Sequence, residues 1–332
     1  ILVPLDGSPL AEQALPVAAR VARACGGTVI LFHVVDPSQA YVSYGALQPL
    51  VTQDAIERSL KRGKSYLDSL LPHSDLAGVT LEEQVILGSP AVVILSILDE
   101  QAIDLVIMSS HGYTGLKHWI LGSTAEKVIH HTPVPILILR EGTFPRSHQR
   151  PDGTPVVRAL VPLDTSARSQ DAIVPAVVLV GAFSSPGQGE LHLTQIITLP
   201  VEINEREKEA LFQEVRQNLR AISESTCKGI VANLGSDFHL TITWSISLDS
   251  DIAAGIVNIA EHGDVAAEGS PVGASDLIAM TTHGYTGMHK WTMGSIAERV
   301  LHATKLPLLL TRPADMVRKE HEKKKSQAET VV

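Results

Sequence analysis

The sequence predicts an α/β protein built from two doubly wound parallel sheets in tandem. Short apolar runs typical of buried parallel strands alternate with longer helical segments. The run Leu2-Val-Pro-Leu-Asp6 recurs as Leu160-Val-Pro-Leu-Asp164. Residues 111–135 align without a gap with residues 283–307, and 14 of these 25 positions are identical. Since a repeat at this spacing indicates two copies of one fold, each half is expected to be one α/β domain.

Length and composition agree with two domains and exclude several function classes. The chain has 332 residues, and its 27 basic and 36 acidic residues give a formal charge of −9. This charge disfavours binding to nucleic acid or to an anionic membrane surface. Aromatic residues make up only 4% of the chain, too few for base-stacking platforms. Cys25 and Cys227 show neither metal nor disulfide spacing, and no signal peptide or membrane-spanning run is visible. We therefore expect a cytoplasmic protein.

In the first copy each strand is followed by a helix. Ser8, Ser89 and Ser123 are expected to be helix N-caps, and Pro90 is typical of a first helical position. Gly26 is expected to end the first helix. The expected helices cover residues 10–25, 51–71, 90–100 and 125–131, and the expected strands cover residues 1–5, 29–35, 80–86, 105–108 and 134–139.

The second copy repeats this order of elements. Its strands are expected over residues 157–163, 191–199, 239–246, 277–280 and 308–311. Asp164 and His283 are 119 residues apart, whereas Asp6 and His111 are 105 residues apart, so the second copy is longer by 14 residues (119 − 105). Residues 263–275, which are rich in Gly, Ala and Ser, are predicted to be a surface insertion that loosens this edge of the second copy. We therefore expect a first domain over residues 1–141, a linker over 142–156, a second domain over 157–313 and a charged, solvated tail over 314–332.

Two loops leave the first and fourth strands at the edge where doubly wound sheets bind ligands. The first loop holds Asp6, an acceptor suited to ribose hydroxyls. The second loop contains Ser109 and Gly112 and ends in Gly122 and Ser123 at the start of a helix. Glycine lets the backbone approach a bulky anion, and a helix N-terminus favours phosphate. The pattern predicts a nucleotide site, but glycines that only close turns and a serine that only caps a helix remain the alternative.

Two prolines fall inside strands that are expected to be central, where proline resists incorporation. Pro4 and Pro162 are each expected to lie at the end of a strand, where the hydrogen-bonded ladder has stopped and a crevice begins. Val34 and Met108, also at strand ends, are expected to cover a base.

With these residues in view, the chain resembles a tandem universal stress protein with two domains of the UspA type. The ATP-binding branch of that family carries the signature Gly, two residues, Gly, nine residues, Gly-Ser/Thr. The corresponding residues are Ser109, Gly112 and Gly122-Ser123 in the first copy and Thr281, Gly284 and Gly294-Ser295 in the second. The last two glycines and the hydroxyl residue match in both copies, whereas Ser109 and Thr281 replace the leading glycine.

The resemblance implies a set of nucleotide-binding residues, carried over position by position. In the first copy they are Pro4, Asp6, Val34, Met108, Ser109, His111, Gly112, Gly122, Ser123 and Thr124. In the second copy they are Pro162, Asp164, Ile196, Met280, Thr281, His283, Gly284, Gly294, Ser295 and Ile296.

The resemblance also implies the fold, the ligand and the assembly. Each domain is expected to have a Rossmann-like five-stranded sheet with the strand order 3-2-1-4-5. The ligand is expected to be ATP, AMP or another adenine nucleotide, with or without Mg²⁺, and the role nucleotide-responsive stress protection. Family members pair through their last strand, so residues 134–139 and 308–311 are expected to join the domains as an internal pseudo-dimer. A homodimer is compatible with this arrangement.

His111 and His283 suggest acid–base catalysis beside a phosphate as an alternative. These histidines are not accompanied by a paired nucleophile, a cluster of carboxylates, a metal-ligand spacing or a Gly-Lys-Ser/Thr motif. The preferred interpretation is therefore that each histidine is hydrogen-bonded within its own loop. Three function classes stay open. We favour a nucleotide-binding regulatory protein without efficient catalysis. The others are a slow ATPase or adenylate-type transferase, and a partner-binding scaffold that holds no ligand.

Overall fold

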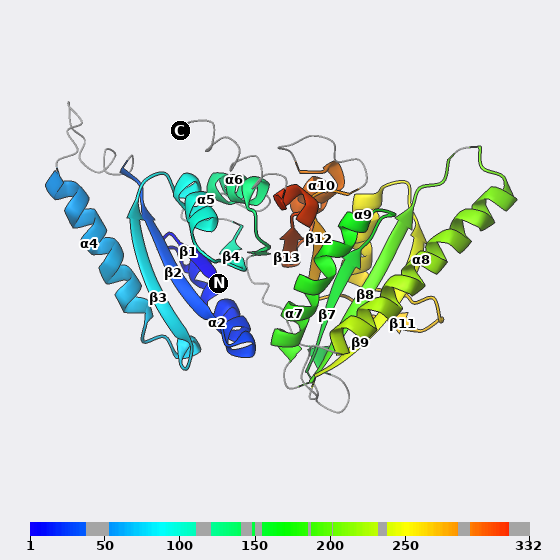
Figure 1. The fold of residues 1–332 in the computed structure, drawn as a ribbon, viewed down its shortest axis with the longest axis horizontal. Coiled ribbons are helices and arrows are strands. Elements are labelled where there is room, and N and C mark those ends of the chain that lie inside the picture. The colour runs from blue at the N-terminus through cyan, green and yellow to red at the C-terminus, as the bar shows by residue number, and fades with distance from the viewer. Residues whose placement is uncertain are drawn as a thin grey trace. The chain divides into compact units, whose positions relative to one another are not determined.

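The computed structural model describes residues 1–37, 53–110, 121–140, 148–149, 155–184, 187–200, 202–231, 238–284 and 293–318. The chain divides into two compact units, Ile1–Gly142 and Thr143–Val332, called unit 1 and unit 2 below. Figure 1 colours unit 1 from blue to green-cyan and unit 2 from green to red. Each unit is an α/β structure built around five main strands that follow one another in the sheet path.

The sheet of unit 1 has the strand order β3-β2-β1-β4-β5, which is the predicted order. All its neighbouring strands that have a described register run parallel. The strands are β1 (Leu2–Leu5), β2 (Thr28–Val35), β3 (Thr80–Leu87), β4 (Val106–Ser109) and β5 (Ile136–Leu139). The helices are α1 (Pro9–Glu12), α2 (Ala14–Cys25), α4 (Gln53–Leu70), η1 (Ser74–Leu76), α5 (Pro90–Glu100) and α6 (Ser123–His131).

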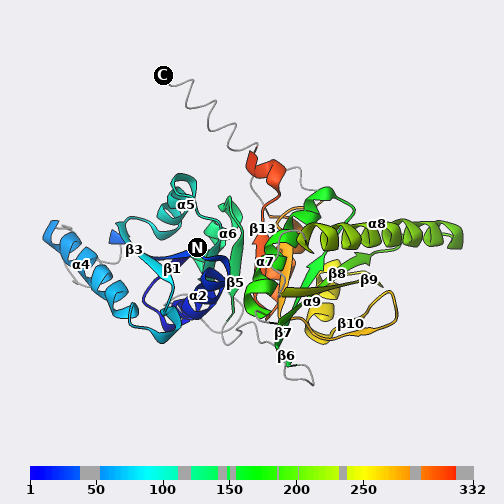
Figure 2. The same ribbon diagram turned by 60° about the horizontal axis from the view of Figure 1, so that its bottom comes forward.

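Helices cover both faces of this sheet, as the right-handed crossovers of a doubly wound fold require. Figure 2 shows α5 and α6 on one side of the strands and α2 and α4 on the other. The two strands at the centre are almost free of solvent contact: Leu2, Val3, Val106 and Ile107 are all 0% exposed. Burial on both faces explains why these strands read as continuous apolar runs.

Unit 2 repeats this arrangement with the order β9-β8-β7-β12-β13. Its strands are β7 (Pro155–Pro162), β8 (Gly187–Ile197), β9 (Phe238–Leu248), β12 (Leu277–Thr281) and β13 (Leu308–Thr311). Its helices are η2 (Ala167–Ala172), α7 (Ile173–Ser184), α8 (Glu205–Val231), α9 (Ile252–His262) and α10 (Ser295–Ala303). Figure 1 shows α7 and α8 on the near side of the strands.

The insertion of unit 2 is an ordered hairpin of β10 (Asp264–Val265) and β11 (Pro271–Val272). The Ala267 N–H donates to Trp244 O of the edge strand β9 at 2.9 Å. Arg158 donates from Nη1 to Ala274 O at 2.8 Å. The expectation that the insertion loosens this edge is therefore wrong, because these hydrogen bonds fix the hairpin to β9 and β7.

Segments expected as linker and tail also carry structure. The strand β6 (His148–Gln149) pairs antiparallel with the start of β7. Residues 314–318 form a short helix that follows β13. Its first N–H, of Ala314, donates to Asp171 Oδ2 at 2.9 Å, and Arg168 pairs with Asp315 at 2.8 Å. The tail thus begins with a helical segment that is anchored to η2.

One expected N-cap lies one residue away from its predicted position. Gly122, not Ser123, is the N-cap of α6, and Gly294 is the N-cap of α10. The backbone of Gly122 is extended (ψ 142°), and its carbonyl already accepts the Glu126 N–H at 2.9 Å. Ser123 is therefore the first helical residue. Among the described residues, no helix combines the length and hydropathy needed to cross a membrane.

Candidate functional site

In both units the first and fourth strands separate at their carboxyl ends. The ladder between β1 and β4 pairs Leu2 with Val106, whereas Pro4 pairs with Phe32 of β2. Proline has no N–H to donate, so a position beyond the last pair on the β4 side suits it. In unit 2 the β7–β12 ladder likewise reaches only Leu160 before Pro162. Pro162 is the last residue of β7, as expected, whereas Pro4 is followed by Leu5 within β1 and the ladder to β2 continues to the Leu5–His33 pair. Both prolines nevertheless lie beyond the last described pair with the fourth strand, on the side where a doubly wound sheet opens.

The turn after β1 presents Asp6. Its Oδ1 accepts the Ser8 N–H at 3.0 Å, and Gly7 between them has φ 86°, a left-handed conformation that favours glycine. The Ser8 hydroxyl then caps α1 by accepting the Ala11 N–H at 3.1 Å. Asp6 is exposed at the end of this chain of hydrogen bonds, with its carboxylate held by the turn.

Unit 2 builds the same turn with a different residue at its centre. Asp164 Oδ1 accepts the Ser166 N–H at 2.8 Å, and Ser166 caps η2. Thr165 stands where unit 1 has Gly7. The aspartate carboxylate is therefore held by a turn in both units. The residue after the aspartate is the conformationally free Gly7 in unit 1 and the stiffer, β-branched Thr165 in unit 2.

The loop after the fourth strand returns to that strand in both units. The Gly122 N–H donates to Ser110 O, and the Gly294 N–H donates to Thr282 O, each at 2.8 Å. These bonds bring the starts of α6 and α10 beside the ends of β4 and β12. His111 and Gly112 lie in the segment 111–120, outside the described residues.

Neither α6 nor α10 has a side-chain hydrogen bond at its N-cap. By contrast, Ser8, Ser166 and Asp251 cap α1, η2 and α9 with their side chains. The first N–H groups of a helix have no partner within the helix, and together with the helix dipole they favour an anion. Ser123 with Thr124, and Ser295 with Ile296, are the first two residues of these glycine-capped helices.

The two loops of unit 2 meet at Asp164 and Gly284. A β-carbon at position 284 would lie 2.1 Å from Asp164 Oδ2, so any larger residue there would have to displace this carboxylate. At Gly294 a β-carbon would lie 3.1 Å from Thr282 O. Gly284 and Gly294 thus lie at close approaches of backbone and side chain.

Thr281, the residue in place of the leading glycine, turns its hydroxyl into its own loop. Thr281 Oγ1 donates to His283 O at 3.0 Å, and Thr282 Oγ1 lies 3.0 Å from His283 Nδ1. His283 is 6% exposed. The histidine is therefore bonded within the loop, which is the preferred interpretation from the sequence.

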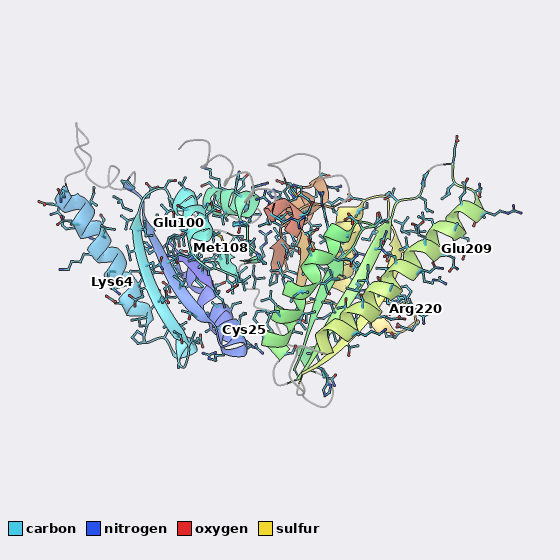
Figure 3. The ribbon with its side chains drawn as sticks, viewed as in Figure 1. Cys25, Lys64, Glu100, Met108, Glu209 and Arg220 are labelled. Atoms are coloured by element: carbon cyan, nitrogen blue, oxygen red, sulfur yellow. The ribbon has the colours of Figure 1, made fainter. Side chains whose placement is uncertain are left out.

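Apolar side chains end the strands beside these loops. Met108, Met280 and Ile196 are buried, and Val34 is half-buried. Figure 3 labels Met108 on β4. Ser109 follows Met108 and is also buried, at 6% exposure. The described part of the chain contains no group of three or more His, Cys, Asp or Glu side chains that could hold a metal ion.

Sequence reasoning missed three residues next to the turn of unit 1. Glu12, His33 and Tyr66 contact it or each other from α1, β2 and α4. Tyr66 lies far along the chain from Asp6, and no local pattern connects them. Only the packing of α4 on the sheet brings them together.

Comparison with known proteins places this geometry in a family. The model of the universal stress protein family matches residues 1–140. A universal stress protein from Thermus aquaticus is 30% identical over 141 residues, which cover 42% of this chain and 97% of that protein. The universal stress protein YxiE from Bacillus subtilis is 30% identical over 146 residues, again 42% of this chain and 97% of that protein.

A solved structure matches almost the whole chain. The crystal structure of a universal stress protein from Archaeoglobus fulgidus superposes with a TM-score of 0.58 at 19% identity. The match covers 94% of this chain and 97% of that one. Single-domain relatives thus match less than half of this chain, whereas a structure of similar length matches both units in fold.

Proposed function

The chain belongs to the universal stress protein family, and on that premise we propose that it is a nucleotide-binding regulatory protein of the stress response. The ligand we propose is ATP, AMP or another adenine nucleotide. We further propose that the protein acts by binding this nucleotide rather than by efficient catalysis. A cytoplasmic location is part of the same proposal.

The glycine-capped helix starts carry this proposal. In both units a helix of nine residues begins at a glycine without a side-chain cap, beside the open ends of the first and fourth strands. Backbone N–H groups at such a helix start bind phosphate oxygens without a charged side chain. Their recurrence in two copies that differ elsewhere favours a ligand over a simple turn.

The neighbouring residues suit the rest of a nucleotide. The carboxylates of Asp6 and Asp164 accept hydrogen bonds, as the hydroxyls of a ribose require. Val34 and Met108 in unit 1, and Ile196 and Met280 in unit 2, offer apolar surface to an adenine ring. Phosphate, ribose and base would then lie in sequence from the helix start to the ends of the strands.

Mass spectrometry of the small molecules released from the purified protein tests the proposal. We expect an adenine nucleotide, and we expect calorimetry of the emptied protein to show ATP binding. The double variant Gly122→Val/Gly294→Val, which places a branched side chain at both helix starts, should lose this binding while still unfolding in a cooperative thermal transition. A protein that carries no nucleotide and binds none would instead support the scaffold alternative.

We also propose that the two units pair within one chain through their last strands. The supporting observation is that β5 and β13 are four-residue strands of mostly apolar residues, all of them buried, and an unpaired edge of this kind would invite pairing. Small-angle scattering of the Ile138→Lys variant tests it, with an increased radius of gyration expected. An unchanged scattering profile would contradict pairing through this edge.

A further inference from the structure

The carboxylate of Asp249 lies at the carboxyl ends of two neighbouring strands of unit 2. Asp249 follows the last residue of β9, and its N–H donates to Ile197 O of β8 at 3.2 Å. The Thr198 hydroxyl donates to Asp249 O at 2.9 Å. Two hydrogen bonds between the strand ends therefore fix the backbone of Asp249, which is half-buried.

The fold uses one oxygen of this carboxylate. Asp249 Oδ1 accepts the Asp251 N–H at 2.8 Å, which closes a turn before α9. Within the described part of the chain, Asp249 Oδ2 has no hydrogen bond or ion pair. The turn thus orients the carboxylate, and Oδ2 keeps its capacity to accept a hydrogen bond.

This second oxygen lies beside the residue that the proposed function assigns to the base of unit 2. A β-carbon built on Gly255, in the first turn of α9, would lie 2.9 Å from Ile196 Cδ1 and 3.2 Å from Asp249 Oδ2. The two atoms therefore border the same point. Because Gly255 has no side chain, α9 can approach both of them. An acceptor is consequently present at the edge of the apolar surface proposed for the adenine ring.

Unit 1 has the same backbone arrangement but no side chain at this place. The Gly88 N–H donates to Val35 O at 3.0 Å, as the Asp249 N–H does to Ile197 O, and each donor follows the third strand of its unit. A β-carbon at Gly88 would lie 2.6 Å from Val93 Cγ2, so a side chain there would have to displace Val93. The carboxylate is therefore a feature of unit 2.

The chemistry of the base decides what this oxygen can recognise. Adenine carries an amino group at C6, which donates hydrogen bonds, whereas hypoxanthine and guanine carry a carbonyl oxygen there, which accepts. A carboxylate oxygen accepts from the amino group and repels the carbonyl oxygen. Since the amino group is hydrogen-bonded to water before it binds, Asp249 Oδ2 adds more to selectivity than to affinity.

We propose that Asp249 is the specificity-determining residue that makes the nucleotide site of unit 2 select a 6-amino purine, with Oδ2 accepting a hydrogen bond from the amino group of the base. This inference rests on the proposed function and adds to it the residue that selects the base. The turn before α9 occupies Oδ1, and the ligand takes Oδ2.

The test compares ATP with inosine triphosphate, which has a carbonyl oxygen in place of the amino group at C6. Calorimetry in the Gly122→Val background measures the site of unit 2 alone. We expect ATP to bind about tenfold more tightly than inosine triphosphate, because the carbonyl oxygen leaves Asp249 Oδ2 without a donor.

Asp249→Asn in the same background should reverse this preference. The amide oxygen stays in the turn with the Asp251 N–H, so the amide nitrogen takes the place of Oδ2 and an acceptor becomes a donor. Inosine triphosphate should then bind several-fold more tightly than ATP. The variant keeps the turn and the size of the side chain, so its melting temperature should hardly change. A role limited to the turn would leave the ratio of the two affinities as in the background protein.

Asp251→Asn is the matched control, two residues along the chain. The Asp251 carboxylate caps α9 by accepting the Ala254 N–H at 3.1 Å, and it pairs with Arg299 at the surface. This variant should keep the preference for ATP. If Asp249→Asn loses its cooperative thermal transition, Asp249→Gly carries the test. It installs the residue of unit 1 and should lose most of the preference.

The outcomes separate this inference from the proposed function. ATP binding with an undiminished preference over inosine triphosphate in both Asp249→Asn and Asp249→Gly would overturn the role of Asp249 and leave nucleotide binding intact. Equal affinities of the two nucleotides in the background protein would do the same. A background protein that binds neither nucleotide would overturn this inference together with the proposed function of unit 2.

Discussion

Asp164 and Gly284 approach so closely that a β-carbon on Gly284 would lie 2.1 Å from Asp164 Oδ2. The two residues come from the loops that follow β7 and β12, which are neighbours in the sheet although far apart in the sequence. Strand order alone brings these loops to one edge. The contact makes the carboxylate and the glycine of unit 2 parts of one site.

Gly284→Ala should weaken nucleotide binding at unit 2. The new methyl group must displace the Asp164 carboxylate, which is the end of a side chain and can move at little cost to stability. We expect a loss of roughly tenfold in affinity with a nearly unchanged melting temperature. Calorimetry in a Gly122→Val background measures this site alone. An affinity equal to that of the background variant would show that the carboxylate does not hold the ligand.

The two sites should bind ATP unequally, with unit 1 the tighter. Gly7 adopts a left-handed backbone beside Asp6, whereas unit 2 has the stiffer, β-branched Thr165 at this position. Ile196 also adds a methylene relative to Val34 under the base. We expect a ratio of about fivefold to tenfold, and titration of the Gly122→Val and Gly294→Val variants measures it. If Gly294→Val removes the tighter of the two ATP-binding events and Gly122→Val leaves it intact, unit 2 is the tighter site and the predicted order of affinities is wrong.

ATP turnover should be absent or slow. The described part of the site offers backbone donors, hydroxyls and carboxylates, and His283 is engaged within its own loop. Phosphate release should therefore stay below about 1 per second, the lower range of dedicated enzymes. Release under multiple-turnover conditions measures the rate, with Gly122→Val/Gly294→Val as the background control. Faster release that these substitutions abolish would establish an ATPase.

The hairpin of unit 2 should make stability depend on acid pH through Asp264. Burial disfavours its charged form, but the His192 ring, whose Nε2 lies 3.6 Å from Asp264 Oδ2, and the hydrogen bond from Ser245 outweigh this and lower the pKa of Asp264 from 3.8 to about 2. A carboxyl whose pKa is lower in the folded state stabilises the fold above pH 4 and loses that contribution as the pH falls towards 2. Allowing for solvent screening, the effect should be about 1 kcal/mol.

Urea unfolding between pH 2 and pH 6 measures this contribution. Asp264→Asn should reduce the fall in unfolding free energy between pH 4 and pH 2. Glu268→Gln, an exposed residue of the same hairpin, should leave the profile of the parent protein. Identical profiles for the parent and Asp264→Asn would contradict the role assigned to the hydrogen bonds.

The ion pair of Arg168 with Asp315 should hold the C-terminal helical segment rather than the whole fold. Its two hydrogen bonds, at 3.1 and 2.8 Å, are partly exposed, and such pairs contribute less than about 1 kcal/mol. Asp315→Asn should accelerate hydrogen exchange in residues 314–318 while the melting temperature changes by a few degrees at most. Exchange that matches the unsubstituted chain would show that other contacts hold this segment.

Much of the fold followed from local patterns. The recurrence of Leu-Val-Pro-Leu-Asp and the alternation of apolar runs with helical segments predicted two doubly wound units, because burial on both faces leaves a continuous apolar signature. The N-cap predicted at Ser123 was wrong by one residue. Serine is the commoner cap, but an extended glycine placed the first helical hydrogen bond one position earlier.

The sequence by itself determined the repeat, the strands and the glycine and aspartate positions of the two loops, since these are set by residue type at fixed spacing. Only the tertiary structure decided which residues support those loops. Tyr66 reaches Glu12 from α4, Asp264 reaches Ser245 from an inserted hairpin, and Asp164 meets Gly284 across neighbouring strands. Such contacts depend on how helices pack on a sheet, and packing joins positions that no local pattern relates.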